Sequence, residues 1–196
     1  MFPARHETRR ARMIAMPSIR PALKVVACLL LVTAPASPAP TAENGDAPAH
    51  PRPPSCDDAR FRAFDFWVGT WDVLLPDGRR AGTNTIERVL DGCLLVETWR
   101  PERGGGGRSI SFFDRQDGRW HQVWVDAHGL VIRFVGARDG AAMRFEGRGL
   151  SPRGEPARYR MSFTPQDDGS VLQEIDISTD GGTSWKRWFT GRYVRH

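Results

Sequence analysis

The segment 119–126, RWHQVWVD, places side chains with binding chemistry at every second position. In an extended chain, successive side chains point to opposite faces. One face therefore carries Trp120, Gln122, Trp124 and Asp126, and the other carries His121, Val123 and Val125. Either face could point inward. We favour the face with the indoles, because large rings fill a protein interior and a buried amide or acid can find partners there.

Glu97 and Trp99 share one face of a second segment, 93–100, and add to this chemistry. If the two faces meet, aromatic walls surround a few polar groups, which is the composition typical of a ligand site. We therefore predict a ligand-binding cavity bordered by Glu97, Trp99, Trp120, Gln122, Trp124 and Asp126. The alternative is that Glu97 or Asp126 simply pairs with an arginine, such as Arg133, Arg158, Arg160 or Arg187.

Other chemistries have less support in the sequence. His121, His128 and the terminal His196 lack the spacing of metal ligands, so we predict no metal and no cofactor, with haem as the alternative. No G-x-S-x-G motif supports Ser-His-Asp catalysis. The net charge of +5 belongs to residues 1–36, which hold six of the 28 basic and one of the 23 acidic residues. The neutral remainder predicts no nucleic-acid partner.

Closely spaced turn signals divide the chain after residue 66 into short segments. Pairs such as Asp117-Gly118 favour hairpin turns, and apolar residues alternate between them. About ten strands are expected, over 70–75, 81–89, 93–100, 109–114, 119–126, 130–136, 141–147, 157–164, 170–178 and 185–194. The fold class is thus all-β, with one short N-terminal helix over 57–64. An antiparallel up-and-down meander of this length favours closure into a barrel, with a two-sheet sandwich as the alternative.

The first 36 residues have the features of an export signal. Basic residues precede the apolar run 25–32, and Ala34-Pro35-Ala36 fits a cleavage site. We predict a signal peptide over 1–36, with a true start at Met1, Met13 or Met16.

The mature protein is then expected in the periplasm or outside the cell. Residues 37–54 are a Pro-rich linker, and 55–196 form the folded domain. Lipid anchoring through Cys28 is not expected, because most of the apolar run follows that cysteine. Gly104–Gly107 predicts a mobile loop at the barrel mouth. No stable membrane insertion is expected once the leader is removed.

Two cysteines, Cys56 and Cys93, remain after cleavage. An even pair in an exported protein predicts a disulfide, with two free thiols as the alternative.

The string Phe64-Asp65-Phe66-Trp67-Val68-Gly69-Thr70-Trp71 resembles the FDFW-x-G-x-W opening of a bacterial family of unknown function. Further matches are Gly92-Cys93, Glu97, Trp99, Trp120, Gln122, Trp124 and Asp126. This resemblance implies a lipocalin-like (calycin) barrel and no particular reaction. Gly69 and Trp71 also resemble the lipocalin G-x-W motif, which implies that Trp71 closes the barrel base beneath Arg192 or Arg195.

The segment 178–185, STDGGTSW, resembles the Asp-box of sialidases and related propellers. That resemblance implies a structural hairpin clamp formed by Ser178, Asp180, Gly182 and Trp185.

Three hypotheses follow for the function. The first is an exported barrel that binds a small, partly apolar molecule in its lumen. The second is an enzyme on the same barrel, with Glu97 or Asp126 as the acid or base. The third is a protein-interaction module of the cell envelope. The sequence favours a binding protein over an enzyme.

Overall fold

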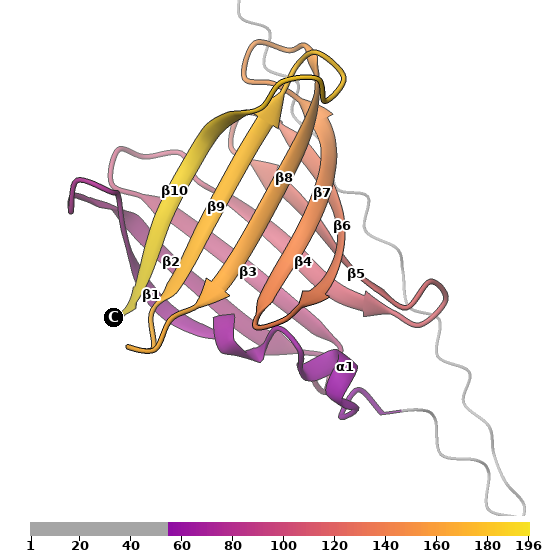
Figure 1. The fold of residues 1–196 in the computed structure, drawn as a ribbon. Coiled ribbons are helices and arrows are strands. Elements are labelled where there is room, and N and C mark those ends of the chain that lie inside the picture. Colours follow the sequence, from indigo (N-terminus) through magenta and orange to yellow (C-terminus); the bar gives the residue numbers. More distant parts are fainter. Residues whose placement is uncertain (1–54) are drawn as a thin grey trace, which may run out of the picture. The chain divides into compact units, whose positions relative to one another are not determined.

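The computed structural model describes residues 55–196. The predicted signal peptide and linker, with Met13, Met16 and Cys28, lie outside the described residues. Two helical turns precede ten strands (Figure 1). In chain order the elements are α1 (Ala59–Arg62), η1 (Asp65–Trp67), β1 (Gly69–Leu74), β2 (Arg80–Val89), β3 (Leu94–Pro101), β4 (Gly107–Asp114), β5 (Arg119–Asp126), β6 (Val131–Asp139), β7 (Ala142–Leu150), β8 (Pro156–Pro165), β9 (Val171–Ser178) and β10 (Lys186–Arg195).

The strands form one closed barrel in the order β1-β10-β9-β8-β7-β6-β5-β4-β3-β2. Each strand pairs antiparallel with its neighbour in the chain, and β10 returns to pair with β1. The predicted all-β, up-and-down closed barrel with a short N-terminal helix is therefore confirmed. This barrel is consistent with a lipocalin-like fold.

Local sequence explains the strand boundaries. In the turn between β8 and β9, Gly169 has a φ of +78°, and the Asp168 carboxylate accepts the Ser170 N–H. The same Asp-Gly chemistry ends several other strands. Strands β6 and β7 run further than expected, to Asp139 and Leu150. Helix α1 is shorter than expected, and Asp58 caps it by accepting the Arg60 N–H.

Aromatic side chains fill one end of the barrel. Helix α1 and η1 lie across this end, as Figure 1 shows. Phe64 stacks on Trp67 with ring centroids 4.8 Å apart, and Trp67 contacts Phe163 at 4.6 Å. All three side chains are fully buried. Their burial stabilises the closed end by several kcal/mol, on the order of 2 kcal/mol for each ring.

Trp71 lies at the same end and is fully buried. Its indole N–H donates to the Trp67 carbonyl at 2.8 Å. The Arg195 guanidinium lies over the indole, 3.8 Å from the ring centroid, and donates to the Val68 carbonyl. Of the two arginines expected beside Trp71, Arg195 takes this position. Arg192 instead pairs with Asp168.

The predicted disulfide is present between Cys56 and Cys93, whose Cα atoms lie 5.1 Å apart. It ties the segment before α1 to the residue before β3. A structural disulfide indicates an oxidising environment outside the cytoplasm. Neither helix of the described part, 55–196, has the length and apolar character needed to cross a membrane.

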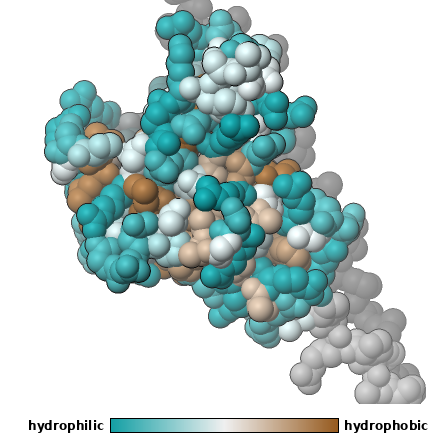
Figure 2. All heavy atoms as spheres, in the orientation of Figure 1, coloured by the Kyte–Doolittle hydropathy of each residue, from teal (hydrophilic) through white to brown (hydrophobic). Residues whose placement is uncertain are grey.

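Most of the face shown in Figure 2 is hydrophilic, and hydrophobic residues appear there only in small patches. This face of the barrel is thus largely polar (Figure 2), and the buried apolar side chains form a cluster inside.

Candidate functional site

A cavity of about 340 Å³ lies at the end of the barrel opposite α1. Two connections and one strand border it there. The connections are the glycine loop Gly104–Gly106 between β3 and β4 and the β5–β6 turn with His128, and the strand is the start of β10. This volume is within the range of small-molecule sites, roughly 300–1,000 Å³. The cavity shows that the lumen is not filled by side chains.

Five of the six predicted site residues line this cavity: Glu97, Trp99, Gln122, Trp124 and Asp126. They come from β3 and β5, and in both strands the predicted indole-bearing face points inward. Gln122 is 3 % exposed, whereas Val125 on the other face of β5 is 44 % exposed.

Trp120 is not among the lining residues, which corrects its predicted place in the site. Its side chain packs at the closed end, where its ring meets Phe64 edge to face and its N–H donates to the Arg60 carbonyl. Trp120 and Trp124 share a face of β5, but Trp120 lies toward the closed end of the barrel and Trp124 lies toward the cavity mouth. Trp120 therefore belongs to the aromatic closure.

The inward residues of β3 and β5 form three levels along the barrel, and a polar belt lies between two apolar levels. On β3 the belt residue Glu97 lies between Leu95 and Trp99, and on β5 Gln122 lies between the two tryptophans. Side chains from β2, β4, β9 and β10 complete the belt with Asn84, Ser109, Gln173 and Tyr193, all buried.

Hydrogen bonds connect the belt across the lumen. Gln122 Nε2 donates to Ser109 Oγ at 3.2 Å, and Ser109 Oγ donates to Glu97 Oε2 at 2.6 Å. Asn84 Nδ2 donates to Glu97 Oε1 at 2.7 Å and to the Tyr193 hydroxyl at 3.1 Å. Tyr193 in turn donates to Gln173 Oε1 at 2.7 Å. These contacts fix the polar side chains at the floor of the cavity.

Glu97 is the one fully buried acid in this network, and within residues 55–196 it forms no ion pair. Loss of solvation raises the pKa of its carboxyl group, and the hydrogen bonds from Ser109 and Asn84 offset part of that rise. Burial also raises the pKa of Tyr193 well above its usual value, and the Glu97 charge adds to the effect.

The alternative that Glu97 pairs with an arginine is not what the structure shows. Arg187 pairs with Glu174 and Asp176 on the outer surface. Arg158 lies beside Glu146, and Arg160 lies over the Trp185 ring.

Asp126 has a different environment at the cavity mouth. Its Oδ1 accepts the backbone N–H groups of His128 and Leu130, at 2.8 and 2.9 Å. This carboxylate therefore shapes the β5–β6 turn as well as lining the cavity. Gly106 fits the same mouth closely, since a Cβ there would lie 2.4 Å from the Trp99 carbonyl oxygen.

Sequence reasoning missed the contribution of β10. The pairing of β10 with β9 shifts register between Arg187 and Phe189, which leaves Trp188 as an extra residue. Such a bulge redirects side chains, and the adjacent Trp188 and Phe189 both line the cavity. In the sequence, the adjacent Trp188 and Phe189 interrupt the alternation of apolar and polar residues. This interruption was the signal that could have indicated the bulge.

The Asp-box-like segment forms a hairpin clamp between β9 and β10. Asp180 accepts hydrogen bonds from Ser178 Oγ and from the Ser184 N–H. The Gly182 N–H donates to Ser178 Oγ, and the Trp185 indole N–H donates to the Gly182 carbonyl. These polar contacts are all internal to the turn, which gives the segment a structural role.

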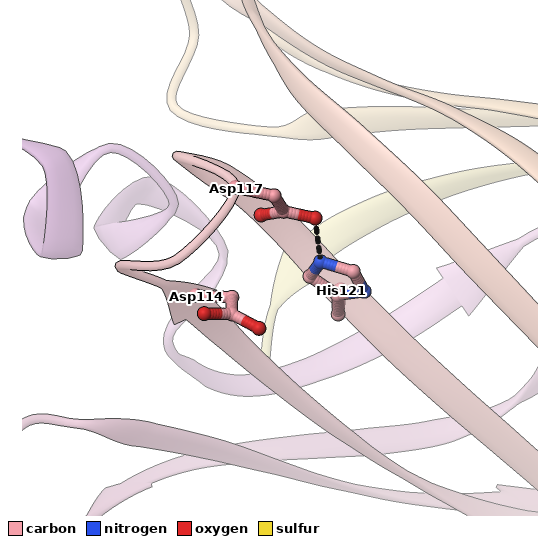
Figure 3. A group of neighbouring side chains, drawn as sticks. All are labelled: Asp114, Asp117 and His121. Atoms are coloured by element: carbon pink, nitrogen blue, oxygen red, sulfur yellow. Dashed lines mark hydrogen bonds and ion pairs between the residues drawn. The ribbon is translucent and has the colours of Figure 1, made fainter.

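Asp114, Asp117 and His121 form a separate cluster at the β4–β5 turn, with candidate ligand atoms within 4.8 Å of one another (Figure 3). His121 Nε2 lies 2.8 Å from Asp117 Oδ2, and its ring stacks on Phe112. Asp114 and Asp117 each accept a backbone N–H of the same turn. These contacts account for the cluster as a structured hairpin turn.

Comparison with family models and with curated proteins finds no match to this sequence. The class of this protein is defined by its fold and its site: it is a closed ten-stranded up-and-down barrel with a cavity in its lumen.

Proposed function

We propose that this protein is an exported lipocalin-like barrel that binds a small, partly apolar molecule in its lumen. The observation that carries this proposal is the cavity of about 340 Å³ above a buried polar belt. A protein optimised for stability alone would fill such a space with aliphatic side chains, because an empty volume and buried polar groups both cost free energy. Here the indoles of Trp99 and Trp124 supply stacking surfaces, and Gln122 and Glu97 supply orienting groups.

The disulfide between Cys56 and Cys93 supports the exported part of this proposal, because structural disulfides persist in oxidising compartments. We infer a periplasmic or secreted protein whose signal peptide ends at residue 36, and membership of the family with the FDFW-x-G-x-W opening. Sequencing the N-terminus of protein recovered from cells tests the export step, with a start near Ser37 expected. An uncleaved N-terminus on cytoplasmic protein would contradict it.

The binding function is tested by mass spectrometry of molecules released from natively purified protein. We expect one small molecule in a near-stoichiometric amount from the wild type. Gln122→Leu is expected to fold normally and to retain much less of it, because the amide lies at the cavity floor. Gln166→Leu is the matched control, since Gln166 is exposed in the β8–β9 turn at the closed end. No molecule above background in the wild type, or equal retention by the two variants, would refute binding in this cavity.

An enzymatic role is the second candidate, favoured by one observation. Glu97 is a buried acid in a cavity with a raised pKa, which is the state a general acid needs. Both of its oxygens accept hydrogen bonds from fixed side chains. The other cavity acid, Asp126, also accepts two backbone N–H groups of the β5–β6 turn. Turnover of a bound molecule that stops in Glu97→Gln would establish the enzyme.

A further inference from the structure

The cavity differs in charge from the rest of the protein. The whole chain holds 28 lysines and arginines. Among the described residues that line the cavity, none is a lysine or an arginine, whereas two are carboxylic acids, Glu97 and Asp126. The arginines of the barrel instead make contacts on the outer surface, as Arg187 does with Asp176. The lining of the lumen thus contains no lysine or arginine among the described residues.

The floor of the cavity also holds acceptor groups that lack a cationic partner or a donor. Glu97 accepts hydrogen bonds only from neutral groups, Asn84 and Ser109. Asn84 is 1 % exposed, and its Oδ1 finds no donor within residues 55–196. A buried carboxylate without a cation, beside an unpartnered amide oxygen, is unfavourable until something supplies positive charge or a donor.

Aromatic faces stand around these acceptors. Trp99 and Trp124 line the cavity above the polar belt, with Phe189 and Trp188 from β10, and Tyr193 lies in the belt itself. Indole and phenyl faces carry negative charge density and attract organic cations, most strongly where water is excluded. Apolar residues such as Ile132 and Phe134 line the same cavity and suit an apolar body.

We propose that the lumen selects small organic cations, with an ammonium group beside Glu97 and an apolar body between the indoles. This inference rests on the proposed binding function and names its ligand class. The charge of the cation compensates the Glu97 carboxylate, and its alkyl groups lie against the aromatic faces. A neutral ligand would leave that carboxylate uncompensated, and an anion would meet both Glu97 and Asp126.

Three probes of matched shape test the inference by calorimetric titration of the full chain freed of small molecules. They are benzyltrimethylammonium, its neutral analogue 2,2-dimethyl-3-phenylpropan-1-ol and the anion 2,2-dimethyl-3-phenylpropanoate. The cation is expected to bind about tenfold more tightly than the alcohol, and the anion most weakly. This comparison is made on the wild type, so it does not depend on any variant folding.

Two variants locate the charge. Glu97→Gln is expected to lower the affinity for the cation about tenfold relative to the affinity for the alcohol. Glu87→Gln makes the same change on the exposed face of β2 and is expected to leave both affinities unaltered. Thermal unfolding of each variant shows that the fold is retained.

A pH series gives an independent readout, because the charge of the ammonium probe is fixed. Affinity should fall in the wild type as the pH is lowered through the raised pKa of Glu97, where the carboxylate takes up a proton, and should fall less in Glu97→Gln. The other ionisable side chains that line the cavity are Asp126, Tyr193 and His128, and His128 is the one base among them. His128→Gln therefore serves as the control and should keep the wild-type pH dependence.

The outcomes separate the inference from the function on which it rests. If the alcohol or the anion binds as tightly as the cation, or if Glu97→Gln binds the cation normally, selection for cations is overturned and lumen binding stands. If no probe binds and no molecule copurifies with the native protein, both proposals fall.

Discussion

Glu97→Gln should change how the stability of the ligand-free protein depends on pH. The folded state raises the pKa of Glu97 above its ordinary value of 4.5, mainly because burial removes its solvation. The folded state therefore holds a proton that the unfolded chain releases at the same pH. Between these two pKa values, the free energy of unfolding falls as pH rises, by at most about 1.4 kcal/mol per pH unit.

The variant isolates this contribution. Its amide side chain keeps the size of the glutamate and can still accept from Asn84, but it does not titrate. We expect the wild type to lose stability relative to Glu97→Gln as pH rises above about 4.5, so that the variant is the more stable protein at neutral pH. The contribution of the wild-type carboxyl group is fully present below that pH, where both chains are uncharged at this position.

Urea unfolding at half-unit pH intervals from about pH 4 to pH 9 measures the difference between the two proteins. Other carboxyl groups have lowered pKa values, such as Asp58 at about 2, and they act on the acid side with the opposite sign. They are common to both proteins and cancel in the difference. Glu87→Gln should run parallel to the wild type. A constant difference between wild type and Glu97→Gln over the whole range would refute the electrostatic account of Glu97.

Three further substitutions test contacts that stabilise the barrel. Replacing both disulfide cysteines with alanine should lower the free energy of unfolding by about 4 kcal/mol, because the bond spans 37 residues of sequence; equal urea midpoints would contradict this. Arg195→Met should cost about 0.5–1 kcal/mol and alter tryptophan emission, since it removes the cation over Trp71; unchanged emission and stability would show that the cation contributes nothing there. Gly147→Ala should cost about 1–3 kcal/mol in thermal unfolding, because its methyl would lie 2.5 Å from the Phe134 ring; a stabilised variant would show that this ring moves freely.

The fold could be predicted from the sequence because each strand pairs with its neighbour in the chain. Turn chemistry such as Asp168-Gly169 marks where each strand ends, and alternation marks which residues point inward. On β5, alternation predicts the inward face of Gln122 and Trp124 correctly. These are local properties, so a single sequence expresses them.

Depth within the barrel and contacts across it could not be predicted, because they depend on register and closure. Trp120 shares a face with Trp124, yet the register pairs it with Phe113 at the closed end. Asn84 meets Tyr193 across 109 residues of sequence, through a contact that exists only in the closed barrel. The bulge at Trp188 adds a second source of error, since it shifts the alternation within one strand.

The closing pair of strands has a consequence for the order in which the protein is made. Every pairing except that of β1 with β10 joins neighbouring strands, so hairpins can form in succession while the chain emerges. The β1–β10 pairing must wait until β10 is made, and it places Arg195 opposite Trp71. Until then, β1 and the most recently formed strand are unpaired sheet edges, to which other chains can pair. Because Tyr193 is part of the cavity floor, a nascent chain cannot hold a ligand in its finished site before β10 has been made.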